Sequence, residues 1–481
     1  MPTNNSRVYL AVAILAAVFI IYIVSTLNRQ HDGNRGTPLR FFGVNSFGIP
    51  FTRFAGAETL RNVSSKELIE ELEHVIQQNG LPADVFYGLS SDVPQEERDE
   101  LQDNNIAVTL HHYFGLYYER CPNDRNRPLK DELELLWEAS PVGVWDINQE
   151  TLAQVHETLG YFEERRQSIR DELKQSAKTR FHYVFNRPES MGSPSLREMI
   201  VNAGASKYLA DYALLEEYAI AQALLDGDIK EAIDALAYIF RITYLASALQ
   251  DIGARADVAH VRLRTFDVMQ RVVLDPKLER QHLVMLRNML AEQRQHWHPE
   301  HSAWFGDRAN GLKYYHYIIL NNALEPEDIA SLKERGMLEA FTQGFRRYHE
   351  LDMLFYLQAM QRIIDISRRP YIDRLDVLSQ IGSELFAKQY TYDSTGIAME
   401  PFVSGFRLHN VDNFMQLFAQ DESALNRALL VMQHSLAQGG VDNFRDPFTD
   451  APYEIRRVEG LLSVSATMLP RPFRVPSKSE P

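Results

Sequence analysis

The spacing of apolar residues along the chain predicts a mainly helical protein. Between residues 211 and 249, two apolar stripes recur at helical intervals on either side of the polar link Asp226-Gly227-Asp228. Each helix has one stripe to bury, and so short a link forces the chain to reverse, so this segment predicts an antiparallel helical hairpin. The first stripe contains Tyr208, Tyr212, Leu215, Ala219 and Ala223, and the second contains Ile229, Ile233, Leu236 and Phe240.

Helical patterns of similar length continue beyond this hairpin. No fixed repeat period is evident, so residues 129–440 are expected to form an irregular tetratricopeptide-like helical array, with a helical bundle as the alternative. The patterns are a helix over 257–273, a helix that starts at Asp275-Pro276 with Leu278, Met285 and Met289 on its stripe, a helix that starts at 325–327, a helix over 352–366, and a last helix that ends at Gly439-Gly440.

Residues 8–27 form an apolar run without a charged side chain. A helix of this length spans about 30 Å, the thickness of the hydrocarbon layer of a membrane. A cleaved signal peptide has a shorter apolar region and a small-residue cleavage site, which Ser25–Arg29 does not provide. We therefore expect a short tail at residues 1–7 and a transmembrane anchor in the lipid bilayer at Val8–Leu27. A signal peptide and a buried core helix are the alternatives.

The remaining segments differ in composition from the helical body. Residues 28–40 are polar and contain glycine, which is typical of a flexible tether. Residues 41–128 form an aromatic-rich mixed segment with a helical pattern over 64–80, and its apolar stretch 106–118 fits a strand or a buried helix. Residues 441–469 predict a small β-hairpin, with strands over 453–458 and 461–465 around Glu459-Gly460, and residues 470–481 predict a disordered tail.

The composition is that of an ordinary globular protein, with 45% hydrophobic and 24% charged residues. The formal net charge is −15 and no basic run stands out, which argues against a nucleic-acid partner. The single cysteine, Cys121, excludes an intrachain disulfide framework and a cysteine-based zinc cluster. The chain has no dinucleotide-binding, P-loop or calcium-loop motif, so no cofactor is expected.

The densest group of potential metal ligands is His296-Trp297-His298-Pro299-Glu300-His301. Zinc accepts imidazole and carboxylate ligands, but Pro299 interrupts the helical face, and the motif lacks two histidines one turn apart beside a glutamate. We therefore expect a polar loop between helices and no metal site. The alternative is a metal-dependent hydrolase that uses His296, His298, Glu300 and His301.

Three other sites have the residue types of catalytic groups without the partners that catalysis needs. His111-His112 have no evident carboxylate or nucleophile beside them, and Cys121 lies among turn-forming residues. Ser193 lacks the second glycine of a nucleophile elbow. We expect His111-His112 to be a buried or half-buried structural pair and Cys121 to lie in a turn. We name no catalytic residue, so enzymatic activity is not favoured.

Four motifs follow one another along the chain: LKQSAKTRFHYVFN at 173–186, the hairpin sequence at 212–245, a stretch at 304–317 that contains Gly-x-Arg, and DPF-x-x-x-PY-x-x-R at 445–457. Together they resemble a set of membrane-anchored helical proteins of planctomycete-type bacteria, over about residues 165–465. The resemblance implies an anchor and an extracytoplasmic helical domain, and it carries over no catalytic residue. The chain departs from the family at 462–466, where the family continues into a Tyr-Ser-x-Gly strand.

The charges that flank the apolar run mildly favour a cytoplasmic body, because one arginine precedes the run and three follow it. Since the family implies an extracytoplasmic domain, we nevertheless expect a single-pass membrane protein with its body outside the cytoplasm. The leading interpretation of its function is a scaffold at the cell envelope that binds a protein or peptide partner. A secretion-apparatus component is a further alternative, because DP-x-x-x-PY is similar to the C-terminal part of secretion pseudopilins. The segment Met1–Val12 lacks their processing site.

Overall fold

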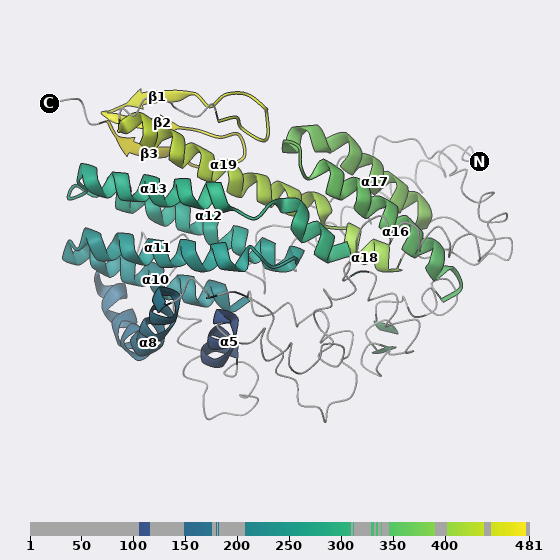
Figure 1. The fold of residues 1–481 in the computed structure, drawn as a ribbon, viewed down its shortest axis with the longest axis horizontal. Coiled ribbons are helices and arrows are strands. Elements are labelled where there is room, and N and C mark those ends of the chain that lie inside the picture. The colour runs from purple at the N-terminus through teal and green to yellow at the C-terminus, as the bar shows by residue number, and fades with distance from the viewer. Residues whose placement is uncertain are drawn as a thin grey trace, which may run out of the picture. The chain divides into compact units, whose positions relative to one another are not determined.

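A computed structural model of the chain describes residues 105–115, 149–175, 179, 181, 207–308, 311, 329–330, 333–334, 338, 346–389, 402–436 and 444–477. These residues are mainly helical and end in a small antiparallel sheet (Figure 1). None of the helices that they form is long and apolar enough to cross a membrane. The predicted anchor, the tether, the helix over 64–80, Cys121, Ser193 and Gly439-Gly440 lie outside the described residues.

The elements follow one another in a simple order along the chain. The helical elements are α5 (Ile106–Leu110), η3 (His111–Gly115), α8 (Gln149–Gln175), α10 (Lys207–Asp226), α11 (Ile229–Ala246), α12 (Ile252–Leu274), α13 (Arg280–His296), α16 (Arg346–Ile366), η7 (Tyr371–Arg374), α17 (Leu375–Gln389), α18 (Phe402–Leu408) and α19 (Val411–Ser435). Residues 300–308 are also helical. The strands are β1 (Ile455–Val458), β2 (Leu461–Val464) and β3 (Phe473–Pro476).

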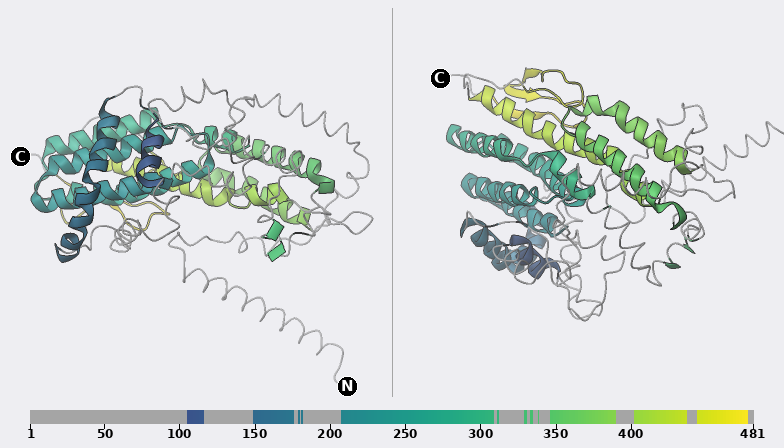
Figure 2. Two further views of the ribbon diagram at one scale, coloured as in Figure 1. Left: turned by 90° about the horizontal axis from the view of Figure 1, so that it is seen from below. Right: turned by 45° about the vertical axis from the view of Figure 1, so that its right-hand side comes forward.

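Helices α10 and α11 form the hairpin that the two apolar stripes predict (Figures 1 and 2). Every residue of both stripes is buried except Ala219, which is half-buried. Gly227 reverses the chain with a φ of 75°, in the left-handed region that residues with a Cβ rarely occupy. Asp228 then caps α11, because its carboxylate accepts a hydrogen bond of 3.0 Å from the backbone N–H of Glu231. The hairpin prediction is confirmed.

Two clusters of buried apolar side chains share helices α12 and α19. The first cluster joins α8, α10, α11, α13 and the sheet, and it includes Val261 of α12 and Leu429 of α19. The second joins α16, η7 and α17, and it includes Ile252 of α12 and Met415 of α19. Since both helices contribute buried side chains to each cluster, α12 and α19 connect the two cores.

The start and the buried face of α13 differ from the prediction. Asp275 does not cap this helix; its side chain accepts a hydrogen bond of 2.8 Å from the backbone N–H of Lys277 and closes the turn that follows α12. The helix begins at Arg280, after the cap residue Glu279, which shifts its buried face. Met285, which the spacing predicts on the apolar stripe, is 44% exposed, and the buried apolar residues of the helix are Leu283, Leu286 and Leu290.

The C-terminal hairpin is confirmed, but the sheet has a third strand. β1 and β2 pair around Glu459-Gly460, both of which have a positive φ, as in a tight hairpin turn. β3 pairs with β2 and lies within residues 470–481, so the prediction of a disordered tail is wrong for this part. Phe473 and Val475 alternate with Arg474 and are buried in the first core, and this burial orders the strand.

Two segments that the sequence left open are helical. Residues 106–110 form a short α-helix, and residues 111–115 continue it as a π-helical turn. Ile106, Leu110 and Phe114 are fully buried in the first core, which favours the helix over the strand for the described part of 106–118. His112 is exposed and contacts the ring of Tyr113 edge-on, so the expectation of a buried or half-buried histidine is wrong for this residue.

We expect Gly227→Val to destabilise the hairpin by about 1–3 kcal/mol, because a β-branched residue is strained in the left-handed region. Ala223→Leu should cost a similar amount, about 1–3 kcal/mol, because Ala223 is buried in the core and a larger side chain overpacks it. Denaturant unfolding measures both changes. The exposed Lys230→Ala is the control and should leave the midpoint unchanged, and equal midpoints for all three variants would contradict the packed hairpin.

Candidate functional site

The predicted ligand cluster lies where the chain passes from α13 into the helix at 300–308, and its side chains have separate partners. His296 is exposed at the end of α13. His298 stacks on the ring of Tyr244 with centroids 5.3 Å apart, and His301 contacts the ring of Phe305 edge-on. No three histidine, cysteine, aspartate or glutamate side chains in the described part of the chain are arranged to hold a metal ion.

Glu300 is held by two groups from the second core. One guanidinium nitrogen of Arg374 lies 2.9 Å from both carboxylate oxygens, and the indole N–H of Trp304 donates a hydrogen bond of 2.9 Å to one of them. Arg374 is itself buried, and it donates further hydrogen bonds to the backbone oxygens of Ser367 and Arg369. The carboxylate therefore joins the start of this helix to η7 instead of facing an open coordination site.

Trp297 lies between two buried arginines. The guanidinium carbon of Arg262 is 3.7 Å from the centroid of the indole, and that of Arg255 is 4.4 Å from it. Both distances are within the range of cation–π attraction, which is stronger when water is excluded. We call Arg255, Arg262, Arg374 and Trp297 together the arginine junction.

Arg262 connects three helices at the arginine junction. From α12 it donates a hydrogen bond of 2.8 Å to the carboxylate of Asp421 on α19 and one of 3.3 Å to the side-chain oxygen of Gln293 on α13. The side chains of Arg262 and Asp421 are 1% and 7% exposed. A buried guanidinium is costly without such partners, so these contacts fix how the three helices pack.

The same burial shifts the ionisation of groups around the junction. Burial lowers the pKa of Arg255 to about 10, although nearby Asp421 opposes the change. Burial, followed by the positive charge of Arg255, lowers the pKa of the His298 imidazole. Burial, followed by Arg368, lowers the pKa of His301. These histidines are therefore neutral at neutral pH, but neither has a carboxylate partner with which to transfer a proton among the contacts of the described residues.

Other buried charges also connect elements that are distant in sequence. Arg170 of α8 donates to Glu216 of α10 at 2.7 Å and lies 2.8 Å from Glu231 of α11. Glu217 lies 2.5 Å from Arg264 of α12, and its burial raises the pKa of this carboxyl to about 7 although Arg264 opposes the shift. In each case the ion pair holds two packed helices together.

A third group of buried charges lies beside the second core. Asp307 accepts a hydrogen bond of 2.8 Å from Arg407 of α18, and burial raises the pKa of its carboxyl to about 6 against the effect of that arginine. The hydroxyl of Tyr356 donates to the backbone oxygen of Asp307 at 2.9 Å, and Ser404 donates to the buried Asp352. These contacts join the helix at 300–308, α16 and α18.

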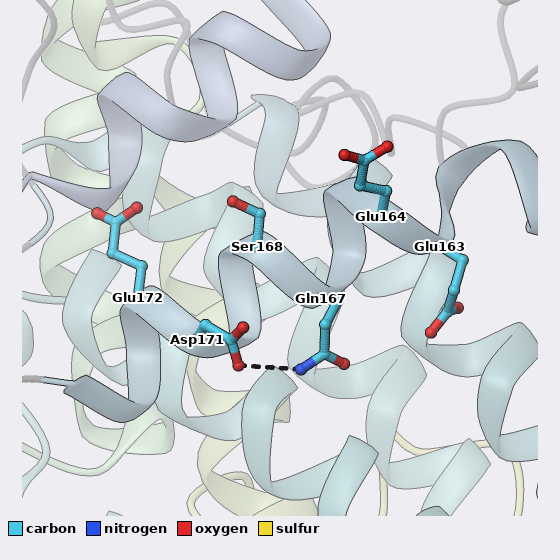
Figure 3. A pocket seen from close by; sticks show the side chains of 6 residues that line it. All are labelled: Glu163, Glu164, Gln167, Ser168, Asp171 and Glu172. Carbon is cyan, nitrogen blue, oxygen red and sulfur yellow. Dashed lines mark hydrogen bonds between the residues drawn. The ribbon is translucent and has the colours of Figure 1, made fainter.

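An acidic hollow of about 800 Å³ is lined by side chains of α8. Figure 3 shows its lining side chains in two rows on this one helix, and Gln167 donates to Asp171 at 2.9 Å. Ser168 accepts a hydrogen bond from Tyr113, and Glu172 accepts one from Thr109. The arrangement attracts positive charge, and its described lining residues include no nucleophile paired with an activating base. The lining residues are Glu163, Glu164, Gln167, Ser168, Asp171 and Glu172.

The sequence analysis did not identify the residues of the arginine junction, although the position of Arg262 in the sequence was one indication of it. Arg262 lies four residues after Val258 and four before Phe266, on the apolar stripe of α12. A charged residue at a core position indicates a buried partner. The partner could not be found in this way, because Asp421 is 159 residues further along the chain.

No family model matches the chain, and no curated protein or solved structure is significantly similar to it.

We expect the purified full-length chain to hold well under one transition-metal ion per molecule, because Glu300 is engaged by Arg374 and Trp304. Elemental analysis after dialysis against trace zinc measures this ratio. A stoichiometric zinc ion that His298→Ala together with His301→Ala removes would instead support the metal-dependent hydrolase.

We expect Asp421→Ala to destabilise the protein by about 3–5 kcal/mol, because it leaves the Arg262 guanidinium buried without its counter-charge. The double variant Arg262→Met with Asp421→Leu should cost less than Asp421→Ala, since it removes both charges of this pair instead of leaving the Arg262 guanidinium without its partner. Denaturant unfolding of the wild type, Asp421→Ala and the double variant measures the three free energies of unfolding. Glu454→Ala removes one partner of the exposed pair Glu454–Arg456 and is the control. A loss from Asp421→Ala no larger than that of the control would contradict the role of the junction.

Proposed function

We propose that the protein is a membrane-anchored helical scaffold that binds a protein or peptide partner at the cell envelope. The proposal rests on what the buried charges of the protein contact. In the arginine junction and at Glu216, Glu217 and Asp307, each buried ionic group bridges two packed elements. Such contacts stiffen a framework, whereas a reaction centre needs a nucleophile, acid or base that faces a substrate.

The helical hairpin supports the finer proposal of a tetratricopeptide-like array. α10 and α11 reverse tightly at Gly227, and α12 then packs against both helices of this hairpin while α13 packs against α11 and α19. In solenoid proteins, stacked helix pairs of this kind expose extended surfaces that bind peptides. The irregular lengths of the helices distinguish this chain from a strict repeat.

The anchor is the second part of the proposal and rests on the sequence. The uncharged run at 8–27 has the length of a membrane-spanning helix, and the polar residues 28–40 provide a tether to the body. We propose a single-pass arrangement with the body outside the cytoplasm, as the resemblance to planctomycete-type proteins implies. The metal-dependent hydrolase and the secretion component have no comparable support from the described residues.

Membrane fractionation tests the anchor. Ala16→Arg should move the protein out of the carbonate-washed membrane pellet, because a charge at the middle of a membrane span costs about 2.5–3.5 kcal/mol on insertion scales. Thr3→Arg adds the same charge outside the apolar run and should leave the protein in the pellet. Deletion of residues 1–30 should release the body, and its persistence in the pellet would reveal a different membrane element. Protease digestion of intact cells then reports the side on which the body lies.

Photo-crosslinking of the full chain in its native membrane tests partner binding. A photoreactive residue at the exposed positions Leu225, Met285 and Val458 should yield a discrete cross-linked species from at least one of them. The exposed Lys230 is a polar reference position. Absence of any cross-linked species at all of these positions, in cells where the protein remains in the membrane, would contradict the scaffold function.

A further inference from the structure

The C-terminal sheet has two edges, and helix α12 closes one of them. The order of strands is β1-β2-β3, so β1 and β3 are the edge strands. The side-chain amide of Gln270 on α12 donates a hydrogen bond of 2.7 Å to the backbone oxygen of Arg474. It also accepts a hydrogen bond of 2.6 Å from the backbone N–H of Arg474. This amide makes the two hydrogen bonds that another strand would make, so the β3 edge is occupied.

This closure also determines which backbone groups of β1 point outward. Because the backbone of Arg474 faces Gln270, it faces away from Ser463, its partner in the register of β2 and β3. Hydrogen bonding alternates along antiparallel strands, so Ser463 bonds across to Arg456 of β1. The neighbouring residues Ile455 and Arg457 therefore direct their N–H and C=O groups away from β2.

The outer edge of β1 is open. No backbone or side-chain hydrogen bond from the described residues reaches the outward groups of Ile455 or Arg457. Arg456 and Arg457 are exposed, and Val458 is 45% exposed. The sheet behind this edge is fixed, since Val464, Phe473 and Val475 are buried in the first core. A fixed strand with free backbone groups needs no ordering before it binds another strand.

The charges on β1 indicate the kind of strand that fits. Arg456 and Arg457 are consecutive, so they project on opposite sides of the sheet, and Arg474 lies in the same cross-strand row as Arg456. Two copies of β1 paired edge to edge would bring like charges together, which disfavours self-association. Glu454 pairs with Arg456 at 2.7 Å, but both side chains are 70% exposed, so a competing carboxylate can displace it.

We infer that the open edge of β1 binds an extended, acidic segment of a partner protein as a fourth strand of the sheet. Main-chain hydrogen bonds to Ile455 and Arg457 hold the segment, and its carboxylates pair with Arg456 and Arg457. This inference rests on the scaffold function proposed above and assigns the surface through which the scaffold takes its partner.

A labelled octapeptide that alternates glutamate with valine is the probe, and the same peptide with lysine in place of glutamate is its control. The full-length chain in detergent should bind the acidic peptide and not the basic one, in a fluorescence anisotropy titration. Binding should weaken as salt is added, because the charges are exposed. Hydrogen exchange should show new protection at the amides of Ile455 and Arg457, with little change at Arg456, whose amide already bonds to β2.

Two variants at one position separate the backbone contribution from the charge. Arg457→Gln removes the charge and should raise the dissociation constant by about two- to fivefold. Arg457→Pro removes the same charge and also the outward N–H, and an edge strand tolerates proline at such a position, so binding should fall by about tenfold or more. Arg456→Glu combined with Arg457→Glu should abolish binding of the acidic peptide and keeps the backbone intact. The unfolding midpoint of each variant verifies that the sheet is folded.

The edge proposal is overturned if the acidic peptide does not bind, if Arg457→Gln and Arg457→Pro weaken binding equally, or if protection appears elsewhere. These outcomes differ from failure of the scaffold function. A chain that cross-links a partner through Leu225 or Met285 but does not bind the acidic peptide is still a scaffold, and its β1 edge is only a charged, self-protected edge. If the full-length chain is found outside the membrane but binds the acidic peptide, the edge proposal is supported and the anchor proposal is contradicted.

Discussion

The packing of the body depends on one buried guanidinium. Arg262 is almost inaccessible to water, so its charge has to be met by protein groups, and Asp421, Gln293 and Trp297 supply them. Loss of hydration for such an ion costs several kcal/mol, which allows few alternative arrangements of the helices that carry these groups. Because α12 and α19 also pass through both apolar cores, the position of this contact relates one core to the other.

The other buried charges follow the same rule and have the same consequence for function. Arg170 joins α8 to the α10–α11 hairpin, and Arg374 joins Glu300 to η7. Hydrogen bonds to charged groups are directional, so they orient helices that apolar contacts alone allow to slide. A body built in this way presents fixed surfaces. The sheet at its C-terminus is one of them, with its β3 edge closed by Gln270 and its β1 edge facing solvent.

The His296–His301 segment illustrates how chemistry-bearing residues can serve packing. Its composition resembles a ligand set, but the chain leaves the helix at Trp297, and successive side chains of the segment contact different neighbours. Trp297 inserts between arginines, His298 stacks on Tyr244, and Glu300 binds Arg374. The number of donors in a short stretch is therefore a poor guide to a metal site unless their directions converge.

The sequence by itself determined the local features of this protein. Apolar periodicity located the α10–α11 hairpin, the lack of a Cβ identified Gly227 as its turn, and turn residues located the β1–β2 hairpin. These features depend on residues a few positions apart. Only the tertiary structure decided the partner of Arg262, the closure of the sheet by Gln270 and the ordering of β3, which composition had suggested was disordered. The physical reason is that buried charge and edge strands are satisfied by groups brought together from distant parts of the chain, 159 residues apart for Arg262 and Asp421.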